Sequence, residues 1–287
     1  MKRKIGKTML ILIGVLLFAA GAALALFSIP GSRTEREFSA VAADSLAQAD
    51  PSDAVFTEND IAGLPAPVQR YLRYCGYLGT PKMSCIRIDY RNVDFVFRGK
   101  KPIKIDYTQY DFVDRPGRIA YIDSSMFGIP FEGIDTYLDG TGRMEGVIAR
   151  IFTLFCQTGN VMDQSGQATF LSEILLFPSA ALQEYVEWET VDDLHAKATM
   201  TDCGRTVSGV FTFDANGELL SFETGDRSAV ASDGTSRQVG WSVAFEQYAK
   251  TNGVKRPTVF KAIWHYDEGD LVYFNGTGLI SADPYPA

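Results

Sequence analysis

The sequence has little of what the commonest metal and catalytic centres require. Its 287 residues include only two histidines, His195 and His265, and four cysteines, none spaced C-x-x-C. The motifs H-E-x-x-H, G-x-S-x-G and S-x-x-K are absent. Structural zinc, thioredoxin-type and motif-bearing hydrolase sites therefore have no support. Both histidines fall on the polar face of predicted strands. We therefore expect them to face solvent rather than to form a metal site or a catalytic triad.

Positive charge is also scarce. The chain has 27 Lys and Arg against 35 Asp and Glu, a formal net charge of −8. Because phosphate backbones are bound by clustered Lys and Arg, this balance argues against nucleic acid as a partner. Residues 214–218 lack the distal carboxylate of a calcium loop, and residues 140–146 lack the helix that completes a phosphate loop. We expect hairpin turns at both places, and neither a metal ion nor a cofactor.

The N-terminus carries one long uncharged run, residues 8–29, directly after four Lys and Arg residues. A helix of this length spans about 33 Å, enough to cross the hydrocarbon core of a bilayer. The basic end is expected in the cytoplasm. We therefore predict that residues 1–30 are a single-pass membrane anchor or uncleaved signal, with the rest of the chain outside the cytoplasm. A signal peptide cleaved near Ala25 is the alternative.

The four cysteines are Cys75, Cys85, Cys156 and Cys203. A location outside the cytoplasm permits disulfides. Cys75 and Cys85 are the expected pair because they are close in sequence. The alternative is that all four are small buried residues.

Most of the chain has the pattern of β-strands. From about residue 83, apolar and polar residues alternate with a period of two, and turns such as Asp139-Gly140 separate the segments. The alternation slips at Arg91-Asn92, which predicts a β-bulge. One strand is expected from Arg143 to about Leu154. We predict a mainly β (α+β) fold, a large antiparallel curved sheet or open half-barrel that is mostly a meander.

Two helices are expected within this β domain, which we assign to residues 59–287. The first lies near residues 64–75, and the second, near residues 166–184, interrupts the strands in mid-chain. Residues 31–58 are polar and alanine-rich, and we expect a helical stalk or a loose linker there. The mid-chain helix is too short to span a membrane, so we interpret it as a lid on the curved sheet.

Glu173 is the residue of most interest in the mid-chain helix, at the margin of its apolar face. If that margin is buried, the carboxylate needs a cation or several donors, or it will take up a proton. Arg143 and Arg150 are the nearest partners in sequence. A structural ion pair, a ligand-binding or catalytic carboxylate and an exposed Glu all remain open.

Five segments together resemble an uncharacterised bacterial family of membrane-anchored domains of unknown function; they are residues 64–74, 137–144, 172–182, 188–193 and 264–266. The resemblance covers most of the chain from about residue 60 and implies no activity or site. The order of elements is also similar, in architecture alone, to periplasmic lipoprotein carriers. That fold is an open β half-barrel whose concave face holds acyl chains under helices.

These patterns favour a domain that binds an apolar or amphipathic, lipid-like ligand under the helical lid. No catalytic residue is assigned. The candidate ligand-binding residues are Phe170, Leu171, Glu173, Ile174, Phe177, Arg143, Trp188, Trp241 and Trp264. The aromatic residues among them either line a cavity or simply fill the core. An envelope interaction module with a filled core and a carboxylate-dependent hydrolase using Glu173 are the alternatives.

Overall fold

The computed structural model describes residues 9, 11–15, 17–18, 21, 31–50, 53–96, 101–231 and 234–282. Most of the predicted anchor, residues 1–30, falls outside these ranges. Within them, no helix is both long and apolar enough to cross a membrane.

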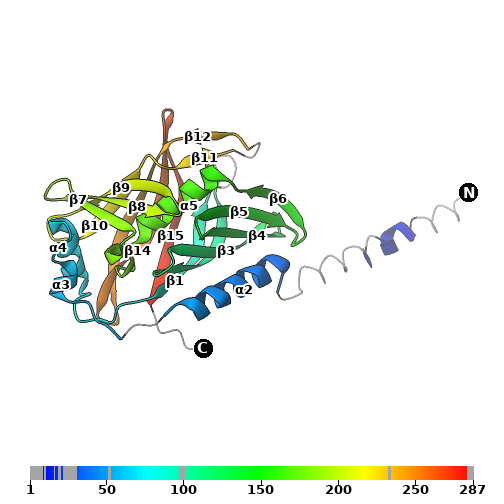
Figure 1. The fold of residues 1–287 in the computed structure, drawn as a ribbon. Helices are drawn as coiled ribbons and strands as arrows, with labels where there is room; N and C mark the ends of the chain where they lie inside the picture. Colours follow the sequence, from blue (N-terminus) through cyan, green and yellow to red (C-terminus); the bar gives the residue numbers. More distant parts are fainter. Residues whose placement is uncertain are drawn as a thin grey trace, which may run out of the picture.

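One antiparallel sheet of thirteen strands forms the body of the domain (Figure 1). The helices are α2 (Arg33–Gln48), α3 (Glu58–Ile61), α4 (Ala66–Cys75), α5 (Asn160–Glu173) and the 3-10 helix η1 (Ala180–Leu182). The strands are β1 (Cys85–Phe95), β2 (Ile103–Phe112), β3 (Gly117–Met126), β4 (Ile129–Leu138), β5 (Thr141–Ile148), β6 (Phe152–Gln157), β7 (Val186–Thr190), β8 (His195–Asp202), β9 (Arg205–Phe213), β10 (Leu219–Thr224), β11 (Ser228–Val230), β12 (Ser236–Gln238), β13 (Gly240–Thr251), β14 (Val254–Tyr266) and β15 (Gly269–Ala282).

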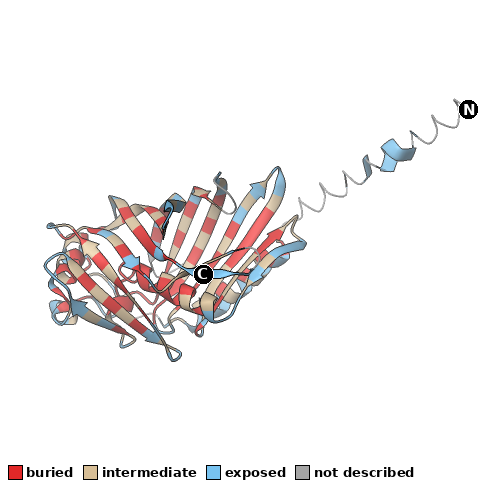
Figure 2. Ribbon diagram, turned by 90° about the horizontal axis from the view of Figure 1, so that it is seen from above, coloured by how far each residue is buried: buried red, intermediate tan, exposed pale blue. Residues whose placement is uncertain are grey.

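The sheet follows the chain as a meander except at two places, where β1 pairs with β15 and where β10 pairs with β13. Its strand order is β6-β5-β4-β3-β2-β1-β15-β14-β13-β10-β9-β8-β7, so the first strand pairs with the last in the middle of the sheet. The edges β6 and β7 do not pair, which leaves the sheet open, and β11 and β12 form a small separate hairpin. Along the strands, buried residues alternate with more exposed ones (Figure 2). The predicted large, curved antiparallel sheet is confirmed.

Helix α5 lies inside the curve and contacts both arms of the sheet. It packs on β4 and β5 from the first half and on β8, β9 and β10 from the second. Its first turn is fixed by Asp163, which accepts a hydrogen bond from the Gly142 backbone nitrogen (2.8 Å) and pairs with Arg205 (3.1 Å). Gly142 is required there, because a Cβ atom would lie 2.1 Å from the Met162 carbonyl oxygen.

Several local predictions hold. The β1 register shifts between Tyr90 and Val93, and Asn92 takes a positive φ of 54°, so the predicted bulge is present. Asp139 and Gly140 have φ values of 50° and 74°, as a two-residue hairpin turn requires. Helix α4 ends at Gly76 in the left-handed conformation, which confirms the helix predicted near residues 64–75.

Two element boundaries differ from the prediction. The single strand expected from Arg143 to Leu154 is wrong: Ala149 and Arg150, with φ values of 54° and 63°, turn the chain between β5 and β6. An Ala-Arg pair lacks the Gly or Asn that usually marks such a turn, so no pattern announced it. The mid-chain helix expected over residues 166–184 also differs, because α5 begins at Asn160, in a polar stretch without apolar periodicity, and ends at Glu173.

The residues after α5 belong to the core rather than to a helical lid. Residues 174–177 form turns and are at most 1% exposed. Helix α4 fixes them, since the Tyr71 hydroxyl donates to the Leu175 carbonyl (3.0 Å). The Tyr77 hydroxyl, just after α4, donates to the Leu176 carbonyl (3.1 Å). Turn geometry frees these carbonyl groups, and buried tyrosines satisfy them.

The stretch expected to be a stalk or linker, residues 31–58, contains α2 and only the first residue of α3. Ser32 caps α2 by accepting a hydrogen bond from the Glu35 backbone nitrogen (3.0 Å). One helical turn apart, Phe38 and Ala42 are buried against β3 and β4, in a second core cluster with Ile119 and Ile134. Helix α2 therefore packs on the sheet instead of standing free (Figure 1).

The expected disulfide does not form. Cys75, Cys85, Cys156 and Cys203 form no disulfide, and the first two are buried whereas the last two are exposed. The expectation of a Cys75–Cys85 bridge is therefore wrong. Cys75 lies on the inner face of α4, and burial raises the pKa of its thiol to about 12. Nearness in sequence was not a sufficient guide, because the two thiols enter different core clusters.

Candidate ligand-binding cavity

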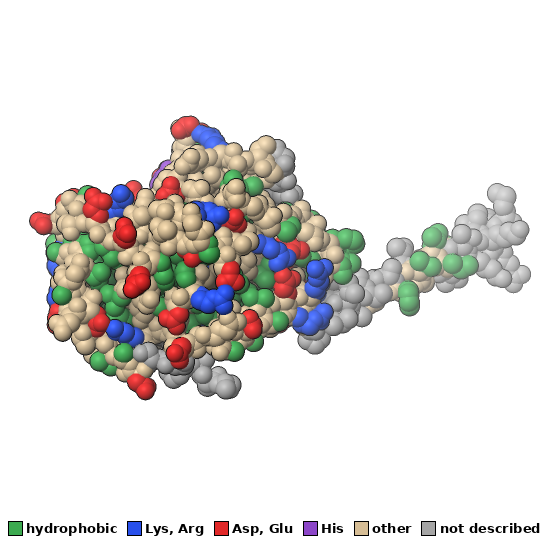
Figure 3. Space-filling view, in the orientation of Figure 1, with side chains coloured by type: hydrophobic (Ala, Val, Ile, Leu, Met, Phe, Trp, Pro, Cys, Tyr) green, Lys and Arg blue, Asp and Glu red, His purple; other side chains and the backbone are tan. Residues whose placement is uncertain are grey.

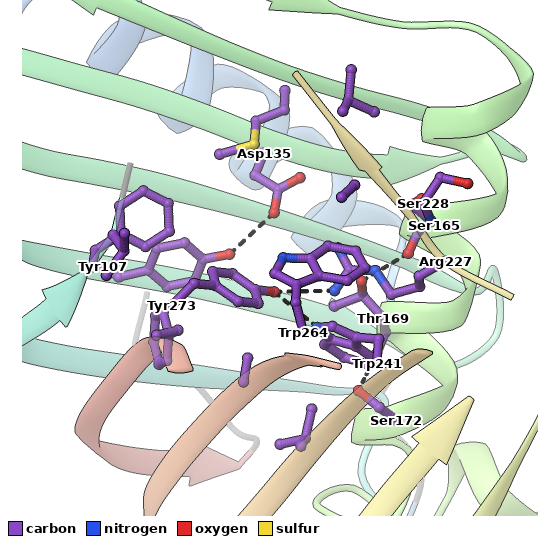
Figure 4. Close-up of a pocket in the computed structure, with 18 of the residues that line it drawn as sticks. Tyr107, Asp135, Ser165, Thr169, Ser172, Arg227, Ser228, Trp241, Trp264 and Tyr273 are labelled. Carbon is purple, nitrogen blue, oxygen red and sulfur yellow. Dashed lines mark hydrogen bonds between the residues drawn. The ribbon is translucent and has the colours of Figure 1, made fainter. Parts of the chain in front are cut away.

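A cavity of about 410 Å³ lies between α5, β11 and the concave face of the sheet (Figure 4). This volume is in the range of small-molecule sites. Most of its wall is aromatic or aliphatic; the apolar lining includes Tyr90, Phe95, Ile122, Met144, Phe155, Val243, Phe245, Phe260, Ala262, Leu271 and Phe274. The core of the domain is therefore not completely filled.

The wall that α5 contributes is polar. Ser165, Thr169, Ser172 and Glu173 recur at intervals of three and four residues, so they share one helix face and line the cavity. The Thr169 hydroxyl donates to the Ser165 carbonyl (2.8 Å), and the Ser172 hydroxyl donates to the Thr169 carbonyl (2.6 Å). These hydroxyls bond back to their own helix, which leaves their lone pairs available to a ligand. The cavity thus has a mostly polar wall on α5, and its lining on the sheet is mostly apolar.

A buried ionic cluster forms one part of the lining. Arg118 on β3 is 3% exposed, donates to Asp135 on β4 (2.8 Å) and lies 3.4 Å from Glu173 at the end of α5. Its guanidinium also donates to the Tyr107 hydroxyl (2.8 Å) and to the Gln109 amide oxygen (3.0 Å). Arg118 is therefore matched by two carboxylates inside the domain.

A third carboxyl group, that of Asp111, adjoins this cluster. Asp111 is completely buried and accepts both of its hydrogen bonds from the Gln109 amide, at 2.9 and 2.7 Å. The same amide nitrogen donates to Glu173 (2.8 Å). Burial first, and then the nearby Glu173 charge, raise the pKa of Asp111. Burial also raises the pKa of Glu173, against the opposing effect of Arg118, so the two carboxyl groups favour a state that holds a shared proton.

An arginine between two tryptophans occupies another part of the wall. The Arg227 guanidinium lies 4.1 Å from the Trp241 ring centroid and 5.1 Å from that of Trp264. It donates to the Tyr273 hydroxyl (3.1 Å), which also accepts from the Trp241 indole nitrogen (3.1 Å) (Figure 4). The Tyr273 and Trp264 rings are stacked with centroids 5.7 Å apart. This arrangement fixes the guanidinium plane at the cavity surface.

The structure separates the sequence-predicted site residues into two groups. Glu173, Trp241 and Trp264 line the cavity. The other predicted residues do not line it. Phe170, Leu171, Ile174 and Phe177 are 0% exposed in the main core, and Trp188 donates its indole N–H to the Ala181 carbonyl (2.9 Å). The apolar face of α5 packs inward, so its polar face is the one that meets the cavity.

The expected partners of Glu173 are wrong. Arg143 pairs with Glu37 of α2 and with Glu145, while Arg150 lies 3.2 Å from Glu132. Arg118 and Gln109 hold Glu173 instead. Proximity in sequence misled the prediction, because α5 reaches across the sheet. Strand alternation could have identified Arg118, because side chains two residues apart share one face of a strand. Arg118 therefore lies on the same face of β3 as the buried Ala120 and Ile122.

The histidines face solvent as predicted, with side chains 37% and 39% exposed. His265 nevertheless has contacts through both ring nitrogens that the sequence did not predict. Its Nε2 atom is 2.8 Å from the Ser242 hydroxyl and its Nδ1 atom is 2.8 Å from Asp270. The three side chains lie on adjacent strands, on the face opposite Trp241 and Trp264. None of the three side chains lines the cavity. A catalytic triad also requires backbone N–H groups that can bind an oxyanion, and the regular pairing of β13 with β14 already engages those groups here.

Comparison with known proteins identifies the family. Residues 54–276 match the model of DUF6544, a family of unknown function. The chain belongs to the DUF6544 family. No curated protein matches this DUF6544 chain. The family resemblance expected from the sequence is confirmed.

Two solved structures are similar to this DUF6544 chain in architecture. One is a LolA superfamily protein from Nitrosomonas europaea, with 10% identity, a TM-score of 0.38, and coverage of 76% of this chain and 94% of that one. The other is a putative outer membrane lipoprotein-sorting protein domain from Vibrio parahaemolyticus, with 13% identity, a TM-score of 0.36, and coverage of 70% and 84%. The expected architectural similarity to lipoprotein carriers is thus found.

The described residues offer less support for a metal ion or a polyanion as the ligand. Within these ranges, no group of three or more His, Cys, Asp or Glu side chains is placed to hold a metal ion. On the face shown in Figure 3, Lys and Arg are interspersed with Asp and Glu instead of gathering in one patch.

Proposed function

We propose that this domain binds an amphipathic, lipid-like small molecule in the cavity between α5 and the concave face of the sheet. The observation that carries the proposal is the cavity of about 410 Å³ beside a core of fully buried side chains. An interaction module with a filled core has no need of such a space. The polar α5 wall facing aromatic side chains suits a molecule with one polar and one apolar part.

The same proposal includes the location of the domain. Residues 1–30 anchor the chain in the cell membrane with the N-terminus in the cytoplasm, and the β domain binds its ligand on the other side. The supporting observation is the basic, then uncharged, order of the N-terminal sequence. A fusion of a phosphatase active only outside the cytoplasm to the C-terminus tests this topology, and an inactive fusion contradicts it.

A carboxylate-dependent hydrolase is the second candidate. One observation favours it: Glu173 lines the cavity, has a raised pKa and lies beside a cation. Its hydrogen bond from Gln109 and its ion pair with Arg118 also fit a structural role, which is why binding is the leading proposal. Hydrolysis of an ester or glycoside substrate by the wild type, lost in Glu173→Gln, would favour the enzyme instead.

Mass spectrometry of bound molecules tests the binding proposal. The protein is purified, extracted with organic solvent and compared with a variant in which Ala262, on the apolar wall, is replaced by Phe. A lipid-like molecule in the wild-type extract that is depleted in Ala262→Phe is expected. A wild-type protein that copurifies with no such molecule, and takes up none when offered mixed bacterial lipids, contradicts the proposal.

A further inference from the structure

We infer that the ligand is an amphiphile with an anionic oxygen head, a carboxylate or a phosphate, which Arg227 and Tyr273 bind. This inference rests on the proposed function, because it assigns the head-group chemistry within the same cavity. Three observations carry it: the charge balance of the two arginines in the wall, the free donors on Arg227, and the unused proton of Tyr273.

The two cavity arginines differ in their charge partners. Arg118 is already matched by Asp135 and Glu173. Among the described residues, no carboxylate forms an ion pair with Arg227, and Glu173 acts on it only through charge attraction at longer range. The only hydrogen-bond acceptor of its side chain there is the Tyr273 hydroxyl. A guanidinium stays charged at all physiological pH values. Arg227 is therefore a cation in the cavity wall whose charge an anion can still neutralise.

The indole rings hold the Arg227 guanidinium in place but do not neutralise its charge. Cation–π contacts with Trp241 and Trp264 act on the faces of the guanidinium and leave its N–H edges free. The Nε atom is buried and has no hydrogen-bond partner in the described part of the chain. A buried donor without an acceptor costs free energy, and a ligand oxygen would remove that cost. The planar fork of N–H groups matches the paired oxygens of a carboxylate or phosphate.

Tyr273 adds a second donor at the same place. Its hydroxyl oxygen accepts hydrogen bonds from both Arg227 and Trp241, at 3.1 Å each. A phenol has one proton to donate as well as lone pairs to accept. With its lone pairs engaged, the Tyr273 hydroxyl has only that proton left to offer, and no acceptor for it is found within the described ranges. The two residues therefore present only donors to the cavity.

The apolar lining gives the tail its place. Phe95, Leu271 and Phe274 line the cavity together with Arg227, and Val243 and Phe245 extend the apolar wall along β13. A head at Arg227 with a hydrocarbon tail along this wall buries apolar surface and neutralises the free cation at once. A neutral lipid gains only the first of these contributions.

Photo-crosslinking of the full-length chain tests the head-group assignment. Two diazirine-bearing probes with the same hydrocarbon chain, a fatty acid and a fatty alcohol, are titrated in the same detergent solution, and labelled cavity peptides are quantified by mass spectrometry. The fatty acid is expected to reach half-saturation at about a tenfold lower concentration, as a hydrogen bond to a charged group implies. In Arg227→Gln the fatty-acid curve should move to that of the alcohol, while the alcohol curve stays unchanged.

Controls separate the possible failures. Arg237→Gln removes an exposed arginine that pairs with Asp267, and it should leave both curves unchanged. Tyr273→Phe keeps the stacked ring, removes the second donor and should give a smaller loss for the fatty acid alone. Equal half-saturation of both probes in the wild type, or an unchanged preference in Arg227→Gln, overturns the anionic head but leaves the binding proposal standing. Absence of saturable cavity labelling by either probe overturns the proposed function itself.

Competition distinguishes an amphiphile from a free anion. An unlabelled alkyl phosphate of the same chain length should displace the fatty-acid probe as the unlabelled fatty acid does, because both offer anionic oxygens to Arg227. Inorganic phosphate should not displace it at comparable concentrations, since it lacks the tail. Displacement by inorganic phosphate at those concentrations would show a simple anion site and overturn the inference.

Discussion

Glu173, the last residue of α5, lies 3.4 Å from the Nε atom of Arg118 on β3, so one ion pair joins the helix to the first half of the sheet. Arg118 also holds Asp135, and both carboxylates lose their cation in Arg118→Met. Breaking a buried pair from one side costs about 3–5 kcal/mol.

We expect that loss in urea unfolding of Arg118→Met. The control is Arg115→Met, at the exposed Arg115–Asp139 pair, which should cost less than about 1 kcal/mol. Equal effects of the two substitutions would contradict the buried role of Arg118.

The stability of the domain should fall as the pH rises above about 5. The pKa values of Asp111 and Glu173 are raised above their usual 3.8 and 4.5, so the folded protein keeps a proton that the unfolded chain has released. This contribution is complete below the unfolded pKa values and is lost as pH rises through the folded ones. One such proton corresponds to about 1.4 kcal/mol per pH unit.

Asp111→Asn should flatten this pH dependence, because an amide of the same shape needs no proton. Thermal melts from pH 5 to pH 8 measure it, with Asp94→Asn, at an exposed ion pair with Lys104, as control. A wild-type protein whose stability rises over this interval while Asp111→Asn behaves alike would show that the pair binds no extra proton.

Filling the cavity should abolish ligand binding without unfolding the domain. Ala262 on β14 lines the cavity, and Phe at that position would occupy part of the space. Ala244→Phe is the matched control, because Ala244 lies on neighbouring β13 with the opposite strand phase and does not line the cavity. Binding of a neutral fluorescent lipid analogue should fail in Ala262→Phe and persist in Ala244→Phe, and undiminished binding in Ala262→Phe would place the ligand elsewhere.

Helix α2 should contribute to the stability of the β domain. Phe38 is buried against β3 and β4, and Phe→Ala substitutions at buried sites cost about 3–5 kcal/mol. Because α2 lies at the edge of the core, Phe38→Ala should fall at the lower end of that range in chemical denaturation. Ser39→Ala, exposed on the same helix, should change little. A Phe38→Ala protein as stable as the wild type would mean that α2 is a free stalk after all.

Thiol titration should find two fast and two slow cysteines. Cys156 and Cys203 are exposed and should react with a maleimide in the native protein, whereas Cys75 and Cys85 should react only after denaturation. All four should titrate in denaturant without a reducing agent. A titre of only two under those conditions would restore the Cys75–Cys85 disulfide.

The sequence predicted what short-range patterns control. Period-two alternation identified the strands, and the bulge at Arg91-Asn92 followed from one slipped residue. Turns with Gly or Asn were recognised, but Ala149-Arg150 was not, because its left-handed backbone has no residue-type signal. The boundary errors at α5 have the same cause, since its first turn is held by polar contacts from β5 and β9 instead of an apolar stripe.

The candidate site was harder to predict because it joins distant segments. Trp241, Trp264 and Glu173 could be nominated one by one, but nothing in their spacing placed Arg227 between the tryptophans. The orientation of α5 was the decisive unknown. Its apolar residue Phe170 looked like the natural cover for a ligand, yet the helix buries that face in the core and turns Ser165 and Thr169 to the cavity.

The pairing of β1 with β15 has a consequence for biogenesis. Among the described strands, β1 is the first in the sequence and β15 the last, yet they lie side by side at the centre of the sheet. Until β15 has been made, β1 and β14 each lack one neighbour, and two hydrogen-bonding edges stay unpaired. Tyr90 of β1 and Phe274 of β15, whose rings meet edge to face in the cavity wall, come together only then. The ligand cavity is therefore completed only once β15 has been made, by the pairing of two strands that lie far apart in the sequence.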